Sequence, residues 1–61
     1  MTNEEIMEYL SYDYGLRHPT DLQIYSKERR NDILRACKEF GASIRQLSRL
    51  TGFSERIVRD A

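Results

Sequence analysis

Two pairs of arginines near the end of the sequence are spaced so that each pair falls on one face of a helix. Arg45 and Arg49 are four residues apart, and Arg56 and Arg59 are three apart. Arginine donates two parallel hydrogen bonds to the edge of guanine, and it also binds phosphate oxygens. The pattern therefore indicates nucleic-acid contact, with Arg56 and Arg59 at base edges and Arg45 and Arg49 on the backbone.

Two serines stand where the helices that carry these arginines are expected to begin. Ser43 is the predicted N-cap of a helix over 44–50, and Ser54 is the predicted N-cap of a helix over 55–61. Free backbone N–H groups at a helix start also bind phosphate, so both serines join the predicted interface. The predicted DNA-binding residues are Ser43, Arg45, Arg49, Ser54, Arg56 and Arg59.

The stretch 51–53 predicts a tight turn between these two helices. Gly52 permits a sharp reversal, and Ser48 is a small residue at the point where the helices must cross. Two short helices joined by a glycine-containing turn of three or four residues form the helix-turn-helix pattern. In such folds the second helix enters the major groove and the first crosses the backbone. Residues 43–61 are therefore predicted to form a helix-turn-helix that binds duplex DNA.

Two longer helices are predicted upstream. Thr2 and Glu5 match a capping box, in which each side chain satisfies a free backbone N–H at a helix start. Gly15 is expected to end this first helix. Ser26 is the predicted N-cap of the longest helix, Lys27 to Phe40.

Residues 16–20 are expected to form a connector, because His18 precedes a proline and is disfavoured in a helix. Thr20 and Gln23 are expected to cap a short helical turn after it. No segment alternates apolar and polar residues with period two, so no strand is predicted. The predicted fold is all-α: one domain over 1–61, a small three- to four-helix bundle that ends in the helix-turn-helix.

Large apolar side chains are expected to close the small core. The apolar stripe of the longest predicted helix consists of Ile33, Leu34, Cys37 and Phe40. Phe53 in the turn is expected to be buried as well. Cys37 is therefore interpreted as a core residue rather than as a reactive thiol.

The formal net charge is zero, but the charges are unevenly distributed. Residues 1–25 hold one basic and five acidic side chains, whereas residues 26–61 hold nine basic and five acidic ones. Such asymmetry favours a nucleic-acid-facing C-terminal half. The acidic first helix is expected to point away from DNA, and Ile6, Met7 and Leu10 on it are a candidate homodimer contact if they are only partly covered.

Several function classes are disfavoured by the composition. No acid–base or nucleophile constellation accompanies the four tyrosines, and one histidine and one cysteine make a poor metal site, so we expect no catalysis, cofactor, metal or small-molecule substrate. No apolar run approaches the ~18 residues of a membrane span. The acidic start does not resemble a signal peptide, so a cytoplasmic location is expected.

From about Glu8 to Ala61 the sequence resembles the C-terminal helix-turn-helix region of small bacterial single-tyrosine insertion-sequence transposases. The resemblance is carried by YGLRHPT at 14–20, RNDIL at 30–34 and GASIRQLSRLTGFS at 41–54. It implies a three- or four-helix DNA-binding bundle, associated with transposition or regulation. The catalytic domain of that family needs a pair of metal-binding histidines and a nucleophilic tyrosine. This chain has only His18, so transposase chemistry is not implied.

A protein-interaction module is the alternative interpretation. The same helical pair can present its outer face to another protein. Glu55 and Asp60 on the expected recognition helix, together with the zero net charge, are compatible with such a partner.

Overall fold

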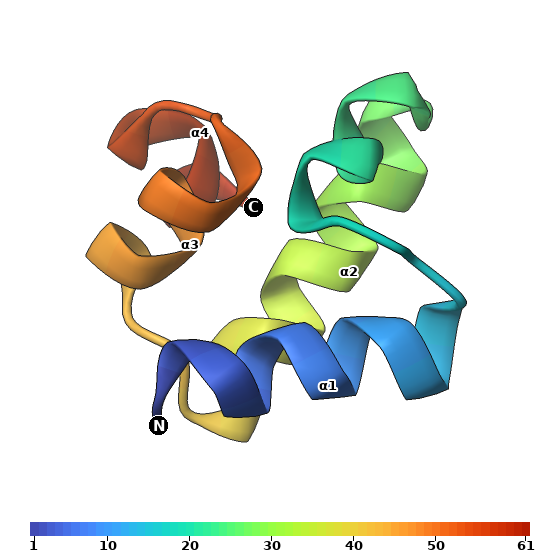
Figure 1. Ribbon diagram of the computed structural model, residues 1–61. Helices are drawn as coiled ribbons and strands as arrows, with labels where there is room; N and C mark the ends of the chain where they lie inside the picture. Colours follow the sequence, from blue (N-terminus) through green and yellow to red (C-terminus); the bar gives the residue numbers. More distant parts are fainter.

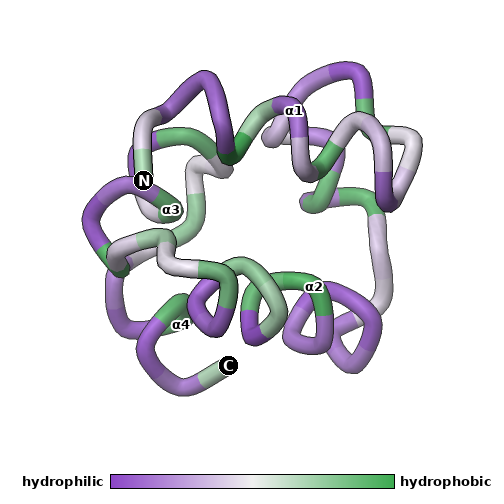
Figure 2. The backbone as a smooth tube through the Cα atoms, turned by 90° about the horizontal axis from the view of Figure 1, so that it is seen from below, coloured by the Kyte–Doolittle hydropathy of each residue, from purple (hydrophilic) through white to green (hydrophobic).

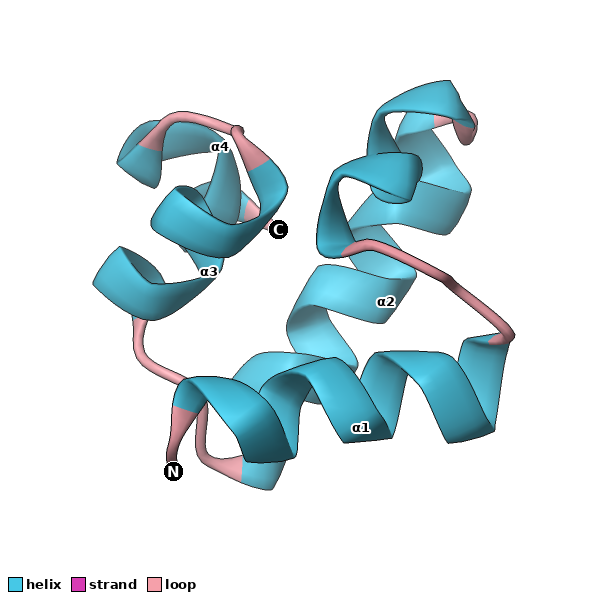
Figure 3. Ribbon diagram, in the orientation of Figure 1, coloured by secondary structure: helices cyan, strands magenta, loops and turns pink.

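The computed structural model describes all 61 residues, and it contains helices but no strand (Figures 1 and 3). The elements in chain order are α1 (Asn3–Tyr14), the 3₁₀ helix η1 (Pro19–Ile24), α2 (Lys27–Phe40), α3 (Ile44–Thr51) and α4 (Glu55–Asp60). The predicted all-α fold class is confirmed. No helix combines the length and the apolar character that crossing a membrane requires.

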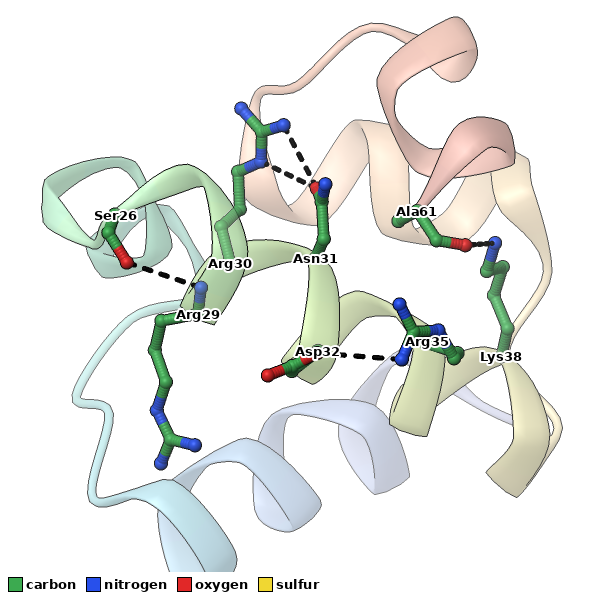
Figure 4. A network of polar contacts seen from close by, with 8 residues as sticks. All are labelled: Ser26, Arg29, Arg30, Asn31, Asp32, Arg35, Lys38 and Ala61. Atoms are coloured by element: carbon green, nitrogen blue, oxygen red, sulfur yellow. Dashed lines mark hydrogen bonds and ion pairs between the residues drawn. The ribbon is translucent and has the colours of Figure 1, made fainter.

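Every α-helix begins after the hydroxyl residue that was predicted to cap it. At the start of α1, the Thr2 N–H donates to Glu5 Oε1 at 2.8 Å, and the Glu5 N–H donates to Thr2 Oγ1 at 3.2 Å. At the start of α2, Ser26 Oγ accepts the Arg29 N–H at 3.2 Å (Figure 4). The caps of all four α-helices are Thr2, Ser26, Ser43 and Ser54. Each cap satisfies a backbone N–H that has no partner inside its helix.

The short helix between α1 and α2 differs from its prediction. It begins after His18, whose backbone N–H donates to a carboxylate oxygen of Asp21 at 3.2 Å. Thr20 is exposed and is not the cap, so the predicted capping by Thr20 and Gln23 was wrong. Proline at the first helical position already supplies the backbone angle that a helix start needs, which moves the start two residues earlier, from a cap at Thr20 to a cap at His18.

The core is small and draws on every element. Its buried apolar residues are Ile6, Leu10, Leu16, Leu22, Ile33, Leu34, Cys37, Ala42, Leu47 and Val58. Figure 2 shows apolar stretches along each α-helix, separated by strongly polar turns that face outward. Each helix is amphipathic and has only one apolar face. The core therefore forms where the apolar faces of several helices pack together.

Phe40 was predicted to be buried, and this prediction was wrong. Its side chain is 59% exposed, and its ring stacks on that of Tyr9 with centroids 4.6 Å apart. The last turn of α2 therefore ends against the outside of α1 and not inside the core. Phe53 is partly buried and packs against the core.

The condition for a homodimer contact on α1 is met only in part. Ile6 and Leu10 are fully covered within the chain, whereas the side chain of Met7 is 42% exposed and that of Tyr12 is 84% exposed. Any contact between copies through α1 would therefore use Met7 and Tyr12.

Cys37 is buried as predicted, and this burial raises the pKa of its thiol from 9.0 to about 11. The unfolded chain releases the thiol proton near pH 9, whereas the folded chain retains it. The free energy of unfolding should therefore fall as the pH rises from about 9 to about 11. Urea denaturation at pH 8 and at pH 10.5 measures this effect. Between these two pH values, the free energy of unfolding should fall less for Cys37→Ala than for the natural sequence. Equal losses would mean that the thiol ionises equally in both states.

Candidate nucleic-acid interface

The turn between α3 and α4 is locked by hydroxyl groups of α3. Ser48 Oγ donates to the Phe53 carbonyl oxygen at 2.7 Å. Thr51 Oγ1 donates to the Leu47 carbonyl oxygen at 2.6 Å and accepts the Phe53 N–H at 3.3 Å. Thr51 is fully buried, so these bonds replace water that its hydroxyl cannot reach. The small residue predicted at the helix crossing, Ser48, thus also fixes the direction in which α4 leaves the turn.

A residue of η1 holds the same turn from the other side. The Gln23 side-chain amide, through Nε2, donates to the Thr51 carbonyl oxygen at 2.8 Å. Gly52 has a φ of +84°, and a Cβ built on it would stand 2.5 Å from Gln23 Nε2. The backbone angle therefore favours glycine at this position, and any larger residue would also have to displace the Gln23 amide.

The end of α4 is held by α2. Lys38 Nζ donates to the Arg59 carbonyl oxygen at 3.2 Å and to the Ala61 carbonyl oxygen at 2.8 Å (Figure 4). These carbonyls have no partners within α4, and a cation is favourable at a helix C-terminus. Lys38 therefore stabilises a helix of only six residues that is too short to be stable alone. The sequence-based prediction did not include Lys38.

The four predicted arginines all lie on the surface of the α3–α4 pair. Arg45 and Arg49 are exposed on α3, and Arg56 and Arg59 are exposed on α4. The Arg56 side chain is 87% exposed, and its only ion pair joins Nε to an Asp60 carboxylate oxygen at 3.9 Å. Val58, which stands between Arg56 and Arg59 in the sequence, is fully buried. One side of α4 thus packs while the other presents guanidinium groups to solvent.

The two predicted serines serve first as helix caps. Ser43 Oγ accepts the Gln46 N–H at 3.0 Å, and Ser54 Oγ accepts the Ile57 N–H at 3.3 Å. Both side chains are exposed. Their contribution to an interface is to set where α3 and α4 begin.

The start of α3 lies beside the start of α1. Gln46 Nε2 donates to the Met1 carbonyl oxygen at 2.6 Å and to Asn3 Oδ1 at 3.3 Å. The first turn of α1 carries Glu4 and Glu5. These carboxylates oppose an anion nearby, so the start of α3 is a poorer phosphate site than its arginine-bearing face.

Acidic and cationic surfaces are separated elsewhere in the molecule. The acidic residues of α1 are Glu4, Glu5, Glu8 and Asp13, and this helix has no basic residue. Figures 1 and 2 show α1 and α4 on opposite sides of the molecule in two perpendicular views. The acidic helix therefore does not cover the arginines of α4.

Arg30 of α2 is a cation that lies close to the α3–α4 pair. Its Nε and Nη2 donate to Asn31 Oδ1 at 3.0 and 2.9 Å (Figure 4). Its guanidinium lies 5.1 Å from the centroid of the Phe53 ring. Arg29, by contrast, lies over the Tyr14 ring at 5.8 Å. Helical spacing alone does not say which segment either arginine meets, whereas the structure places only Arg30 against the turn.

No group of three or more histidine, cysteine, aspartate or glutamate side chains lies together in a way that would hold a metal ion. The pKa of Tyr9 is raised to about 12, mainly by its interaction with the Tyr14 side chain and to a smaller extent by burial. Tyr9 therefore stays protonated at neutral pH and is a poor nucleophile.

Comparison with protein-family models, curated proteins and solved structures finds no match to this chain. The resemblance to the transposase C-terminal region accordingly stays a prediction from the motifs at 14–20, 30–34 and 41–54.

Proposed function

We propose that this protein binds duplex DNA through α3 and α4, with α4 in the major groove. The observation that carries the proposal is the division of α4 into two sides. Val58 is buried against the core, while Arg56 and Arg59 project into solvent at the end of a hydroxyl-locked glycine turn. A recognition helix needs this combination, because it must be held by one side and must read bases with the other.

The acidic residues of α4 are compatible with this role. The Arg56–Asp60 pair is long and exposed, and such pairs contribute little stability. Arg56 can therefore release Asp60 and donate to a guanine edge with little loss of stability. A carboxylate such as that of Glu55 can accept a hydrogen bond from cytosine N4. Arg45 and Arg49 on α3 contact phosphates, which orient the module without reading sequence. The protein supplies no chemistry of its own and acts as the DNA-binding part of a transposase-related or regulatory system.

Binding of fluorescent duplex DNA, followed by anisotropy at two salt concentrations, tests this proposal. Replacing Arg56 and Arg59 together by alanine should weaken binding by at least about 10-fold, because each bidentate base contact contributes about 1–3 kcal/mol. Affinity for the natural sequence should also fall as salt rises, since phosphate contacts release counterions.

The matched control is the double variant Arg17→Ala/Arg35→Ala. It removes the same charge from exposed positions outside α3 and α4, and it should bind nearly as well as the natural sequence. Absence of salt-sensitive binding by the natural sequence would exclude the proposal. So would equal losses in the two double variants, because net charge alone would then explain them.

A protein partner is the second candidate function, and Glu55 and Asp60 on the outer side of α4 favour it. A partner with its own basic and acidic groups would match this mixed surface. In that case the natural sequence would fail to bind duplex DNA, and substitution of Arg56 would instead weaken capture of a protein.

A further inference from the structure

A groove of about 400 Å³ separates the first half of α2 from α4. Its lining residues are Lys27, Arg30 and Asn31 from α2, and Arg56, Ile57 and Asp60 from α4. Three of these side chains are cationic and one is acidic, although the whole chain carries equal numbers of basic and acidic residues. The groove is therefore a local concentration of positive charge on a molecule that has none overall.

One cation of the groove is held in place before any ligand arrives. Asn31 Oδ1 accepts hydrogen bonds from two nitrogens of the Arg30 guanidinium (Figure 4). The centroid of the Phe53 ring lies 5.1 Å from the same guanidinium. A guanidinium has five N–H donors, so those that do not face Asn31 remain available. Because Arg30 is partly buried and oriented, it loses less conformational freedom on binding than a free arginine does.

The other two cationic side chains of the groove, those of Lys27 and Arg56, are accessible to a ligand from solvent. Lys27 is the first residue of α2 and is exposed, and the Arg56 side chain is 87% exposed. Asp60 opposes an anion, but its only ion pair is the long one with Arg56. If Arg56 leaves Asp60 to bind an anion in the groove, that anion is attracted by three cationic side chains and repelled by one carboxylate.

We propose that this groove binds a backbone phosphate of the DNA whose bases α4 reads, with Lys27 and Arg30 as the phosphate-binding residues. This inference rests on the proposed function, and it extends the interface from the α3–α4 pair to α2. The ligand is a phosphodiester of duplex DNA because the groove opens beside Arg56, so one strand reaches both the recognition side of α4 and the groove. Phosphate contacts of this kind fix the register of a recognition helix and carry no sequence information.

The test compares Lys27→Gln and Arg30→Gln with Arg17→Gln, which removes the same charge from an exposed connector position outside the groove. Each variant is titrated against two unrelated fluorescent duplexes at several salt concentrations, and its helicity is checked by circular dichroism. Lys27→Gln should weaken binding several-fold to the same extent on both duplexes. It should also reduce the slope of log K against log [salt] by about 0.9, the value for one lost phosphate contact.

Arg30→Gln should behave in the same way, Lys27→Arg should restore the natural affinity and slope, and Arg17→Gln should leave both nearly unchanged. Lys27 is exposed at the start of α2, so its substitution is informative even if Arg30→Gln fails to fold. If the natural sequence binds DNA and Lys27→Gln keeps the natural slope, the groove proposal is overturned while the proposed function stands.

If the natural sequence does not bind DNA, the proposed function fails and a second measurement decides on the groove. Inorganic phosphate is then titrated into the protein while backbone amide shifts are recorded by NMR. Shifts confined to Lys27, Arg30, Asn31 and Arg56 would support an anion site. Absent or scattered shifts would overturn it.

Discussion

Replacing Leu47 by alanine is expected to lower the free energy of unfolding by about 2–5 kcal/mol. Leu47 is fully buried in α3, and its carbonyl oxygen accepts the Thr51 hydroxyl that locks the turn. A chain of 61 residues has a total stability of only roughly 3–9 kcal/mol at typical values per residue. The variant should therefore lose roughly half of the stability of the chain.

Urea denaturation followed by circular dichroism measures this effect. Arg45→Ala, on the exposed side of the same helix, is the matched control and should change the stability by less than about 0.5 kcal/mol. A Leu47→Ala variant as stable as the control would mean that α3 is not anchored in the core by Leu47.

Gly52→Ala is expected to lower the free energy of unfolding by about 1.5–3.5 kcal/mol, and to weaken the proposed DNA binding further than that cost alone predicts. The left-handed backbone angle contributes about 1–2 kcal/mol. The new Cβ would displace the Gln23 amide, which stands 2.5 Å from its position, and would break the bond to the Thr51 carbonyl. A lost hydrogen bond of this kind contributes about 0.5–1.5 kcal/mol. Because the same turn directs α4, its distortion also moves Arg56.

Gly15→Ala separates the two contributions. Gly15 has a similar φ of +70°, but a Cβ there would meet nothing within 4 Å, so only the backbone cost applies. In a Gln23→Ala background the obstruction at Gly52 is absent, and Gly52→Ala should then cost about as much as Gly15→Ala. Equal costs for Gly52→Ala in both backgrounds would show that Gln23 yields without penalty.

The helices could be predicted from the sequence because their start signals are local. Ser26 and Ser43 each bond a backbone N–H three residues ahead, so the residue types within one turn decide where α2 and α3 begin. The arginine pairs of the candidate interface were predictable for the same reason. Helical spacing alone places Arg56 and Arg59 on a shared side of α4 that does not include the buried Val58.

Contacts between distant segments could not be predicted in this way. Gln23 meets Thr51 across 28 positions, and Lys38 meets Ala61 across 23. Neither residue stands at a spacing that indicates its partner. Phe40 continues the apolar spacing of its helix. Whether its side chain is buried depends, however, on how the end of α2 packs against Tyr9 of α1.

Arg30 illustrates the same limit within the candidate interface. Helical spacing places Arg30, and not its neighbour Arg29, on the side of Ile33, Leu34 and Cys37, but it does not say which segment Arg30 meets there. What distinguishes Arg30 is the Phe53 ring beneath it and its place beside α4, and both depend on the tertiary arrangement.

The supports of the α3–α4 pair originate outside it. Gln23 braces the turn, Lys38 closes the last carbonyls of α4, and the Gln46 amide is anchored on Met1. A synthetic peptide spanning only 43–61 would lack all three braces and most of the core. Such an excised fragment should be a random coil in water, so the α3–α4 pair cannot be transplanted onto another scaffold without η1 and α2.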